Sequence, residues 1–144
     1  MKKVLVTIFS LLMIGNVVAC PNLAGTYRCH VSDLSLNLPD YNLDLSQNGT
    51  IFTSSIDGGP SESVIADGVL REFDIDGFSG SLKTFCSGDA LVVDYNTQVV
   101  SEGVTIETSG HTTKRKSGSV LTEISEITVY GQVYSIITSV CNEI

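Results

Sequence analysis

The sequence contains no tryptophan and only three prolines, and it has half as many basic as acidic residues. Eight lysines and arginines stand against sixteen aspartates and glutamates, which gives a formal net charge of −8 at pH 7. A chain with this charge repels nucleic acid and anionic membrane surfaces, so neither is expected as a partner. Beyond the N-terminal region no apolar run approaches the roughly 20 residues of a membrane-spanning helix, and no transmembrane segment is expected.

Recognisable catalytic and metal-binding patterns are also missing. There is no Gly-x-Ser-x-Gly motif, and neither His30 nor His111 has a carboxylate at a spacing typical of a catalytic pair. The cysteines form no Cys-x-x-Cys pair, so no zinc site is expected. Glu72–Gly77 resembles a calcium loop, but Lys83 stands at the twelfth position, where such a loop needs glutamate. We therefore expect no enzymatic activity, no metal and no cofactor.

The N-terminus has the features of a secretory signal peptide. A positively charged start at residues 1–3 precedes an apolar run over residues 4–14, and small residues lead to a cleavage site after Ala19. Removal of residues 1–19 would leave residues 20–144 as a single domain. Two of the eight basic residues would leave with the signal peptide, so the mature net charge would be −10. We predict an exported protein, periplasmic or extracellular.

All four cysteines lie in the predicted mature chain, at Cys20, Cys29, Cys86 and Cys141. An even number in a small exported chain predicts two disulfides, and four cysteines permit three pairings, among which the strand pattern does not choose. Val17-Val18-Ala19-Cys20 also fits the signal of a bacterial lipoprotein. Because lipidation of Cys20 would leave one unpaired thiol, we expect Cys20 to form a disulfide in a soluble protein. A lipoprotein anchored through Cys20 is the alternative.

After Cys20 the sequence alternates between apolar and polar residues and shows no helical periodicity. Turn signals such as Asn48-Gly49 and Asp67-Gly68 predict hairpins between short strands. Strands are expected over 26–38 (with a bulge), 41–46, 50–56, 62–66, 69–75, 80–86, 90–99, 103–113, 119–129 and 132–141. Evenly spaced strands of this kind predict an all-β fold. Short sequential connections favour one antiparallel up-and-down barrel of about 8–10 strands, stapled by disulfides and closed by pairing of the first and last strands.

Bulky side chains are predicted to point into this barrel. The expected interior set is Tyr27, Leu36, Leu43, Leu45, Leu91, Val93, Tyr95, Ile106 and Ile136. A barrel of about eight strands is either filled by its own side chains or holds one small ligand. The sequence therefore leaves open whether a cavity exists.

The segment from Leu23 to Tyr27, which reads Leu-Ala-Gly-Thr-Tyr, is similar to the opening of lipocalin-like barrels. In that family a Gly-x-Trp near the start of the first strand plugs the closed end, and Asp94-Tyr95 resembles a second lipocalin signature. The resemblance implies a barrel whose end motif is Gly25 and Tyr27. The chain departs from lipocalins because it lacks tryptophan, an arginine in the last strand to stack on it, and a C-terminal helix.

Two further resemblances concern exported barrels. Phe85-Cys86-Ser87-Gly88, followed by an alternating run over residues 91–95, is similar to a pattern in small periplasmic lysozyme inhibitors. The opening Cys-Pro-x-Leu-x-Gly-x-Tyr-x-Cys resembles the start of small exported bacterial proteins of unassigned function. In that resemblance Cys20 and Cys29 bracket the entry strand.

A basic cluster is the most distinctive surface feature that the sequence predicts. The basic residues His111, Lys114, Arg115 and Lys116 fall in a predicted hairpin tip over residues 111–118, which either contacts an acidic partner or is a solvated loop.

The sequence as a whole leaves two candidate functions. One is a binding module for a small apolar ligand, or a scaffold filled by its own side chains. The alternative is a protein–protein interaction module, such as a lysozyme-type inhibitor, that presents this loop.

Overall fold

The computed structural model describes residues 19–32, 38–75, 78–101 and 103–144. Within these residues ten antiparallel strands form one sheet, in the order β4-β3-β2-β1-β10-β9-β8-β7-β6-β5. The strands are β1 (Gly25–Val31), β2 (Tyr41–Asn48), β3 (Ile51–Ile56), β4 (Glu62–Ile65), β5 (Leu70–Ile75), β6 (Phe78–Ser87), β7 (Ala90–Ser101), β8 (Val104–Ser117), β9 (Val120–Val129) and β10 (Gln132–Glu143). The predicted all-β antiparallel fold is confirmed, and in the described sheet all consecutive strands pair except β4 and β5.

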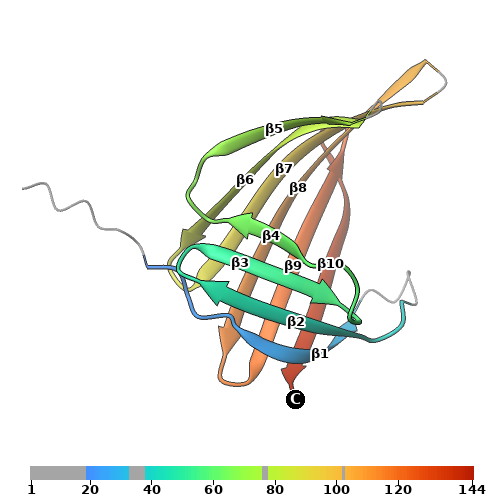
Figure 1. Cartoon of the computed structure of the whole chain (residues 1–144). Helices are drawn as coiled ribbons and strands as arrows, with labels where there is room; N and C mark the ends of the chain where they lie inside the picture. Colours follow the sequence, from blue (N-terminus) through green and yellow to red (C-terminus); the bar gives the residue numbers. More distant parts are fainter. Residues whose placement is uncertain (1–18, 33–37, 76–77, 102) are drawn as a thin grey trace, which may run out of the picture.

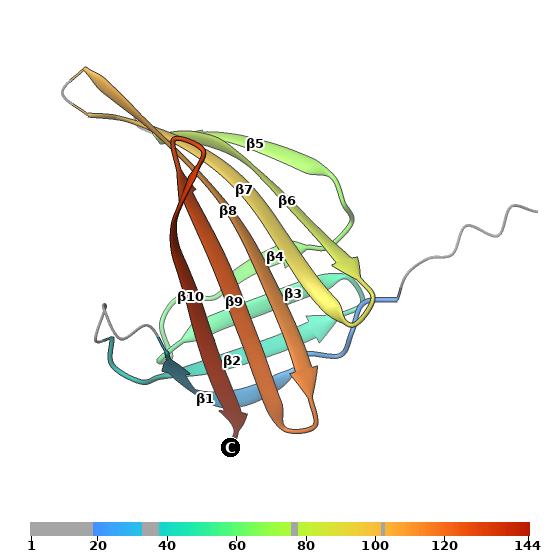
Figure 2. The same cartoon turned by 180° about the vertical axis from the view of Figure 1, so that it is seen from behind.

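The sheet curls into a half-barrel. The long strands β6–β10 form one wall, and the shorter strands β1–β4 lie across the lower part of that wall (Figures 1 and 2). The first and last strands pair as predicted, with Cys29 opposite Cys141 in the register of β1 and β10. This seam joins the two walls and defines the closed end of the molecule.

The half-barrel is open on one side, because β4 and β5 are the two unpaired edges of the described sheet. The expected tight hairpin at Asp67-Gly68 is therefore wrong. The backbone N–H of Ala66 donates to the carbonyl of Thr50, and the N–H of Gly68 donates to the carbonyl of Thr84 on β6. Because these donors are taken by other parts of the sheet, the chain crosses from one wall to the other instead of turning back on β4.

Most observed strand limits lie within a few residues of the predicted ones. One strand is longer than predicted at its C-terminal end, since β8 continues to Ser117 instead of ending at residue 113. The first strand ends at Val31, and the predicted bulge falls on residues 33–37, outside the described residues. The extra length of β8 matters below, because it adds Lys114, Arg115 and Lys116 to the strand that already carries His111.

Two turns show how the sequence sets the connections. Tyr130 and Gly131 both have positive φ, 50° and 74°, as a two-residue hairpin turn of the primed type requires. At Asn48-Gly49 the hairpin exists, but Asn48 pairs with Ile51, so the turn residues are Gly49 and Thr50. Gly49 supplies the positive φ of 61°.

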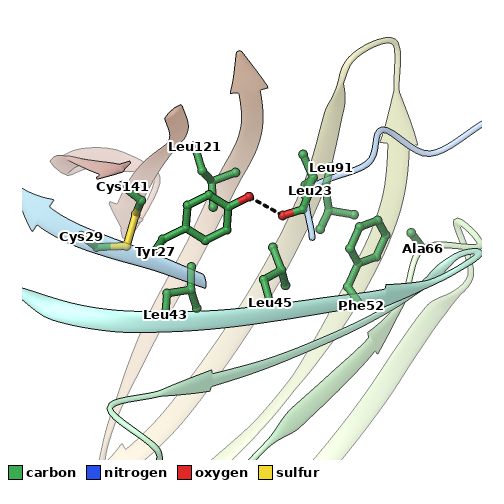
Figure 3. Close-up of a cluster of buried hydrophobic side chains, with 10 residues drawn as sticks. All are labelled: Leu23, Tyr27, Cys29, Leu43, Leu45, Phe52, Ala66, Leu91, Leu121 and Cys141. Carbon is green, nitrogen blue, oxygen red and sulfur yellow. Dashed lines mark hydrogen bonds between the residues drawn. A yellow bond between two sulfur atoms is a disulfide. The ribbon is translucent and has the colours of Figure 1, made fainter. Parts of the chain in front are cut away.

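The core lies at the closed end, where β1–β3 cross the long strands (Figure 3). Its buried members are Leu23, Tyr27, Cys29, Leu43, Leu45, Phe52, Ala66, Leu91, Leu121 and Cys141. The expected interior set is confirmed for Tyr27, Leu43, Leu45 and Leu91, and Leu36 lies outside the described residues.

The remaining members of the expected interior set are less buried. Val93 and Tyr95 are half-buried, and they belong to the cavity described below. Ile136 is 58% exposed because it pairs with Glu126 on the outer face of the sheet. Ile106 is on the inner face but 40% exposed, because the pairing between β8 and β9 begins only at Thr108.

The two predicted disulfides are present, and the structure selects one of the three pairings. Cys29–Cys141 is fully buried and links β1 to β10 across the seam. Cys20–Cys86 links the segment before β1 to the end of β6. The predicted signal peptide falls almost entirely on residues 1–18, which lie outside the described part. Among the described residues, no helix is long and apolar enough to cross a membrane.

Candidate functional site

The closed end is filled by Tyr27, one of the two residues of the predicted barrel-end motif. Its side chain is fully buried, and its hydroxyl donates to the carbonyl oxygen of Leu23 at 2.7 Å (Figure 3). Gly25 leaves room for the ring, because a Cβ at this position would lie 2.8 Å from the end of the Tyr27 side chain. Gly25 and Tyr27 therefore lie together at the base of the half-barrel.

A cation covers the Tyr27 ring, although the sequence has no arginine in its last strand. The Lys116 ammonium lies 5.3 Å from the ring centroid and donates to the carbonyl of Ala24 at 3.0 Å. It also pairs with the Glu143 carboxylate at 3.1 Å, and its side chain is only 18% exposed. The Tyr27 side chain, followed by Glu143, holds the pKa of Lys116 above its ordinary value. Lys116 thus fastens β8 to the segment that enters β1.

The loop predicted over residues 111–118 is wrong, because these residues lie on β8 up to Ser117 and only then turn. The four basic side chains alternate between the two faces of the strand, and each contacts an acidic side chain. The pairs are His111–Asp94, Lys114–Glu123, Arg115–Asp89 and Lys116–Glu143. A role of this cluster in binding a protein partner stays a prediction.

Above the core the inner face of the half-barrel bears a cavity of about 230 Å³ that is open to solvent on one side. Its lining consists of Leu45, Phe52, Ser54, Val64, Leu91, Val93, Tyr95, Thr112, Lys114 and Glu123. The lining side chains come from both walls. Four of them lie on β2, β3 and β4, and the other six, from Leu91 to Glu123, lie on β7–β9. The crossing of the two walls therefore creates the cavity.

Strand alternation explains which side chains reach the cavity. Directly opposite residues of antiparallel strands share a face, and the register places Val93 opposite Thr112 and Tyr95 opposite Gly110. Gly110 has no side chain, and the Tyr95 ring occupies the space where its Cβ would stand. This packing holds the Tyr95 ring against the inner face of the sheet, where it forms part of the cavity wall.

One ion pair stands in this otherwise largely apolar wall. Lys114 Nζ lies 2.6 Å from Glu123 Oε2, and each side chain is only 23% exposed. The two residues are direct cross-strand partners on β8 and β9, on the same face as Thr112 and Ser125. The hydroxyls of Thr112 and Ser125 are 2.9 Å apart and form the next polar pair along these strands.

Sequence reasoning missed this pair because it ended the strand at residue 113. Had the alternation been continued through Gly110, Thr112, Lys114 and Lys116, both lysines would have been assigned to the inner face. Glu123 gave no signal by itself, since an isolated glutamate in a strand pattern usually faces solvent. Only the register between β8 and β9 shows that it lies opposite Lys114.

The structure places both histidines next to aspartates, which their sequence spacing does not indicate. His30 Nδ1 lies 2.8 Å from Asp40, and His111 Nδ1 lies 2.6 Å from Asp94. The hydrogen bond from His30 lowers the pKa of Asp40. Both imidazoles are more than half exposed, and neither lines the cavity. Each therefore forms a hydrogen bond with its aspartate at the surface.

The residues of the supposed calcium loop line a different, polar hollow of about 560 Å³ on β5–β7. Glu72 and Asp74 lie opposite Ser81 and Ser79, and the rest of the loop, residues 76 and 77, is outside the described part. Within the described residues no group of three or more histidine, cysteine, aspartate or glutamate side chains could hold a metal ion. We take the apolar cavity as the candidate site, because side chains from both walls of the half-barrel converge on it.

Neither the known family models nor the curated protein sequences include a match to this chain. Among solved structures, the fatty-acid-binding protein isolated from Manduca sexta is similar in fold. The superposition has a TM-score of 0.48 at 16% sequence identity, and it covers 83% of this chain and 98% of that protein.

Proposed function

We propose that this protein is an exported binding protein that holds a small apolar or amphipathic molecule inside its half-barrel. The observation that carries the proposal is the cavity of about 230 Å³, which the chain's own side chains leave unfilled. Six of the lining residues are apolar or aromatic, namely Leu45, Phe52, Val64, Leu91, Val93 and Tyr95. An apolar cavity of about 150 Å³ is enough to bind benzene, so this one suits a somewhat larger molecule.

The inner face offers a continuation for a longer apolar tail. Beyond Tyr95 the same face carries Thr97 opposite Thr108, and then Val99 opposite Ile106. Phe78 of β6 lies opposite Val99, and it stacks on Phe73 with 5.5 Å between the ring centroids. Phe78, Val99 and Ile106 are exposed although they are apolar, so a bound tail would remove apolar surface from water.

The two disulfides support an exported location, because disulfides persist in oxidising compartments. The signal-peptide pattern at residues 1–19 supports the same location. An exported protein of this design would carry or sequester its ligand outside the cytoplasm. The closed end, fixed by Tyr27 and Lys116, would form the floor of the site.

The test fills the cavity with one side chain and places the same side chain elsewhere as a control. Val93→Trp puts an indole into the cavity, and Val100→Trp puts one on the opposite, exposed face of the same strand, β7. Because the wild-type chain has no tryptophan, each indole also reports its own environment by fluorescence.

Binding is followed with N-phenyl-1-naphthylamine, a neutral apolar dye whose emission rises in apolar surroundings. We expect the wild type and Val100→Trp to bind the dye alike, and Val93→Trp to bind it at least about tenfold more weakly, since an indole fills most of the space. Circular dichroism and thermal melting check that both variants fold. A folded Val93→Trp protein that binds as the wild type does, or a wild type that binds no dye, would overturn the proposal.

A further inference from the structure

The cavity wall also specifies the polar end of the ligand, on the basis of the proposed function above. We infer that the ligand carries an uncharged head that both donates and accepts hydrogen bonds, such as an alcohol or a primary amide. The Lys114–Glu123 pair is the observation that leads to this inference. Carboxylates and amines with the same hydrocarbon tail are expected to bind more weakly.

The first step concerns the charge of the site. Lys114 and Glu123 are the two charged members of the cavity lining, and they face each other at 2.6 Å. The other polar members, Ser54, Thr112 and the Tyr95 hydroxyl, are uncharged. The wall therefore presents a cation and an anion side by side with no net charge.

The second step concerns unused hydrogen-bonding capacity. A lysine ammonium has three N–H donors, and a carboxylate has two oxygens with about four acceptor positions. Within the described residues, Lys114 donates to Glu123 Oε2, and no further hydrogen bond of either side chain occurs. Donors on Lys114 and acceptor positions on Glu123, including Oε1, stay open beside the apolar lining. The hydroxyl of a ligand can accept a hydrogen bond from the Lys114 ammonium and donate one to the Glu123 carboxylate at the same time.

The third step compares ligand heads in this partly desolvated place. An alcohol or amide replaces its water contacts with two charge-assisted hydrogen bonds and adds no charge. A carboxylate would sit near the Glu123 carboxylate and would have to compete for Lys114, which leaves one anion without a full partner. An ammonium would sit near the Lys114 ammonium and would have to compete for Glu123, which leaves one cation without a full partner. A charge left unpaired in a water-poor site is strongly unfavourable, so the neutral heads are preferred.

The experiment compares four ligands with the same eight-carbon skeleton: 1-octanol, octanamide, octanoate and octylamine. Each competes with bound N-phenyl-1-naphthylamine at pH 7. For the wild type we expect the alcohol and the amide to displace the dye at concentrations about tenfold lower than the carboxylate and the amine require. This ranking requires no mutation, so a variant that fails to fold does not prevent the test.

Two variants test whether the Lys114–Glu123 pair causes this ranking of the four ligands. If it does, each variant should change the ranking in favour of one charged ligand. Glu123→Gln leaves Lys114 without its anion, so octanoate should gain about tenfold relative to octanol. Lys114→Met leaves Glu123 alone, so octylamine should gain instead. The matched control is Glu126→Gln, which removes the same charge from the outer face of the same strand, opposite His111. It should keep the wild-type ranking.

The results separate the two proposals. If the wild type binds the dye but prefers octanoate or octylamine, the inference about the head is overturned while the binding function stands. The inference about the head is also overturned, and the binding function again stands, if Glu123→Gln and Glu126→Gln rank the four ligands in the same order. If neither the dye nor any of the four ligands binds the wild type, the proposed function fails, and the inference fails with it.

Discussion

The Lys116 ammonium lies over the Tyr27 ring, and the Tyr27 hydroxyl binds the carbonyl of Leu23. These contacts join β8, β1 and the segment before β1 at one point of the closed end. Lys116 adds a third link through the carbonyl of Ala24. A lysine from the eighth strand thus supplies the cation that stabilises the plug of the half-barrel.

Replacing Lys116 should weaken the fold at this point. Lys116→Met keeps the length of the side chain but removes the cation–π contact and the hydrogen bonds to Ala24 and Glu143. We expect the free energy of unfolding to fall by about 1–3 kcal/mol, measured by urea denaturation. The neighbouring Arg115→Met removes an exposed ion pair and should lower it by less than about 1 kcal/mol. Equal losses in the two variants would contradict this role of Lys116.

The two glycines on the inner face should respond differently to alanine. At Gly110 a new Cβ meets the free end of the Tyr95 ring, which can rotate, whereas at Gly80 it meets the backbone carbonyl of Asn96. Gly80→Ala should therefore lower the free energy of unfolding by about 1–3 kcal/mol. Gly110→Ala should be less destabilising but should change dye binding, because Tyr95 lines the cavity. Thermal melts and dye titrations of both variants check the contrast.

The two disulfides should differ in their resistance to reduction. Cys20 and Cys86 are half-buried, whereas Cys29 and Cys141 are completely buried. Mild reductant followed by alkylation of the native protein should label Cys20 and Cys86 first, as read by peptide mass spectrometry. Labelling of Cys29 and Cys141 should need denaturant. Early labelling of the Cys29–Cys141 pair would show that the seam opens more easily than its burial indicates.

The fate of Cys20 can be read from the mass of the mature protein. The Cys20 sulfur is bonded to Cys86, and a sulfur in a disulfide cannot carry a thioether-linked lipid at the same time. We expect the protein isolated from its producing cells to show no acyl chains, no free thiols and a mass reduced by the hydrogens lost in two disulfides. A mass heavier by acyl chains, with one free thiol on Cys86, would favour the lipoprotein alternative.

The connection between the two edge strands should be sensitive to strong acid. The hydrogen bond from Arg71, together with the Val69 N–H, lowers the pKa of Asp67 from 3.8 to about 2. Because the folded pKa is depressed, the stabilisation is complete above pH 4 and is lost as the pH falls through about 2. A carboxyl titration followed by NMR should give this low midpoint. Arg71→Gln should return it toward 3.8, whereas Arg28→Gln, which contacts Asp40, should leave it unchanged.

Local patterns in the sequence predict the strands and most turns well. Alternation assigns Tyr27, Leu43, Leu45 and Leu91 to the interior, and glycine-containing pairs mark the hairpins, because these signals depend on neighbouring residues. The pattern fails at Asp67-Gly68. There the outcome depends on whether β4 and β5 can pair, and the carbonyl that Gly68 meets belongs to distant Thr84.

The candidate site shows the same limit more strongly. A count of bulky residues indicates that the barrel could be filled, but the cavity arises from how far apart the two walls stand, which no local pattern contains. Lys114 and Glu123 meet only through the register of β8 and β9. The disulfide pairing also had to come from the three-dimensional structure, because all three alternatives agree with the strand order.

The Cys29–Cys141 bond has a topological consequence. The cross-linked residues are 112 positions apart, so the bond turns most of the polypeptide into a covalent macrocycle. A protease that nicks the exposed turn at residues 57–60 would open this ring without releasing a fragment. The nicked protein would migrate as one molecule until a reductant is added. The same ring keeps the unfolded chain from extending fully, which favours refolding after transient denaturation.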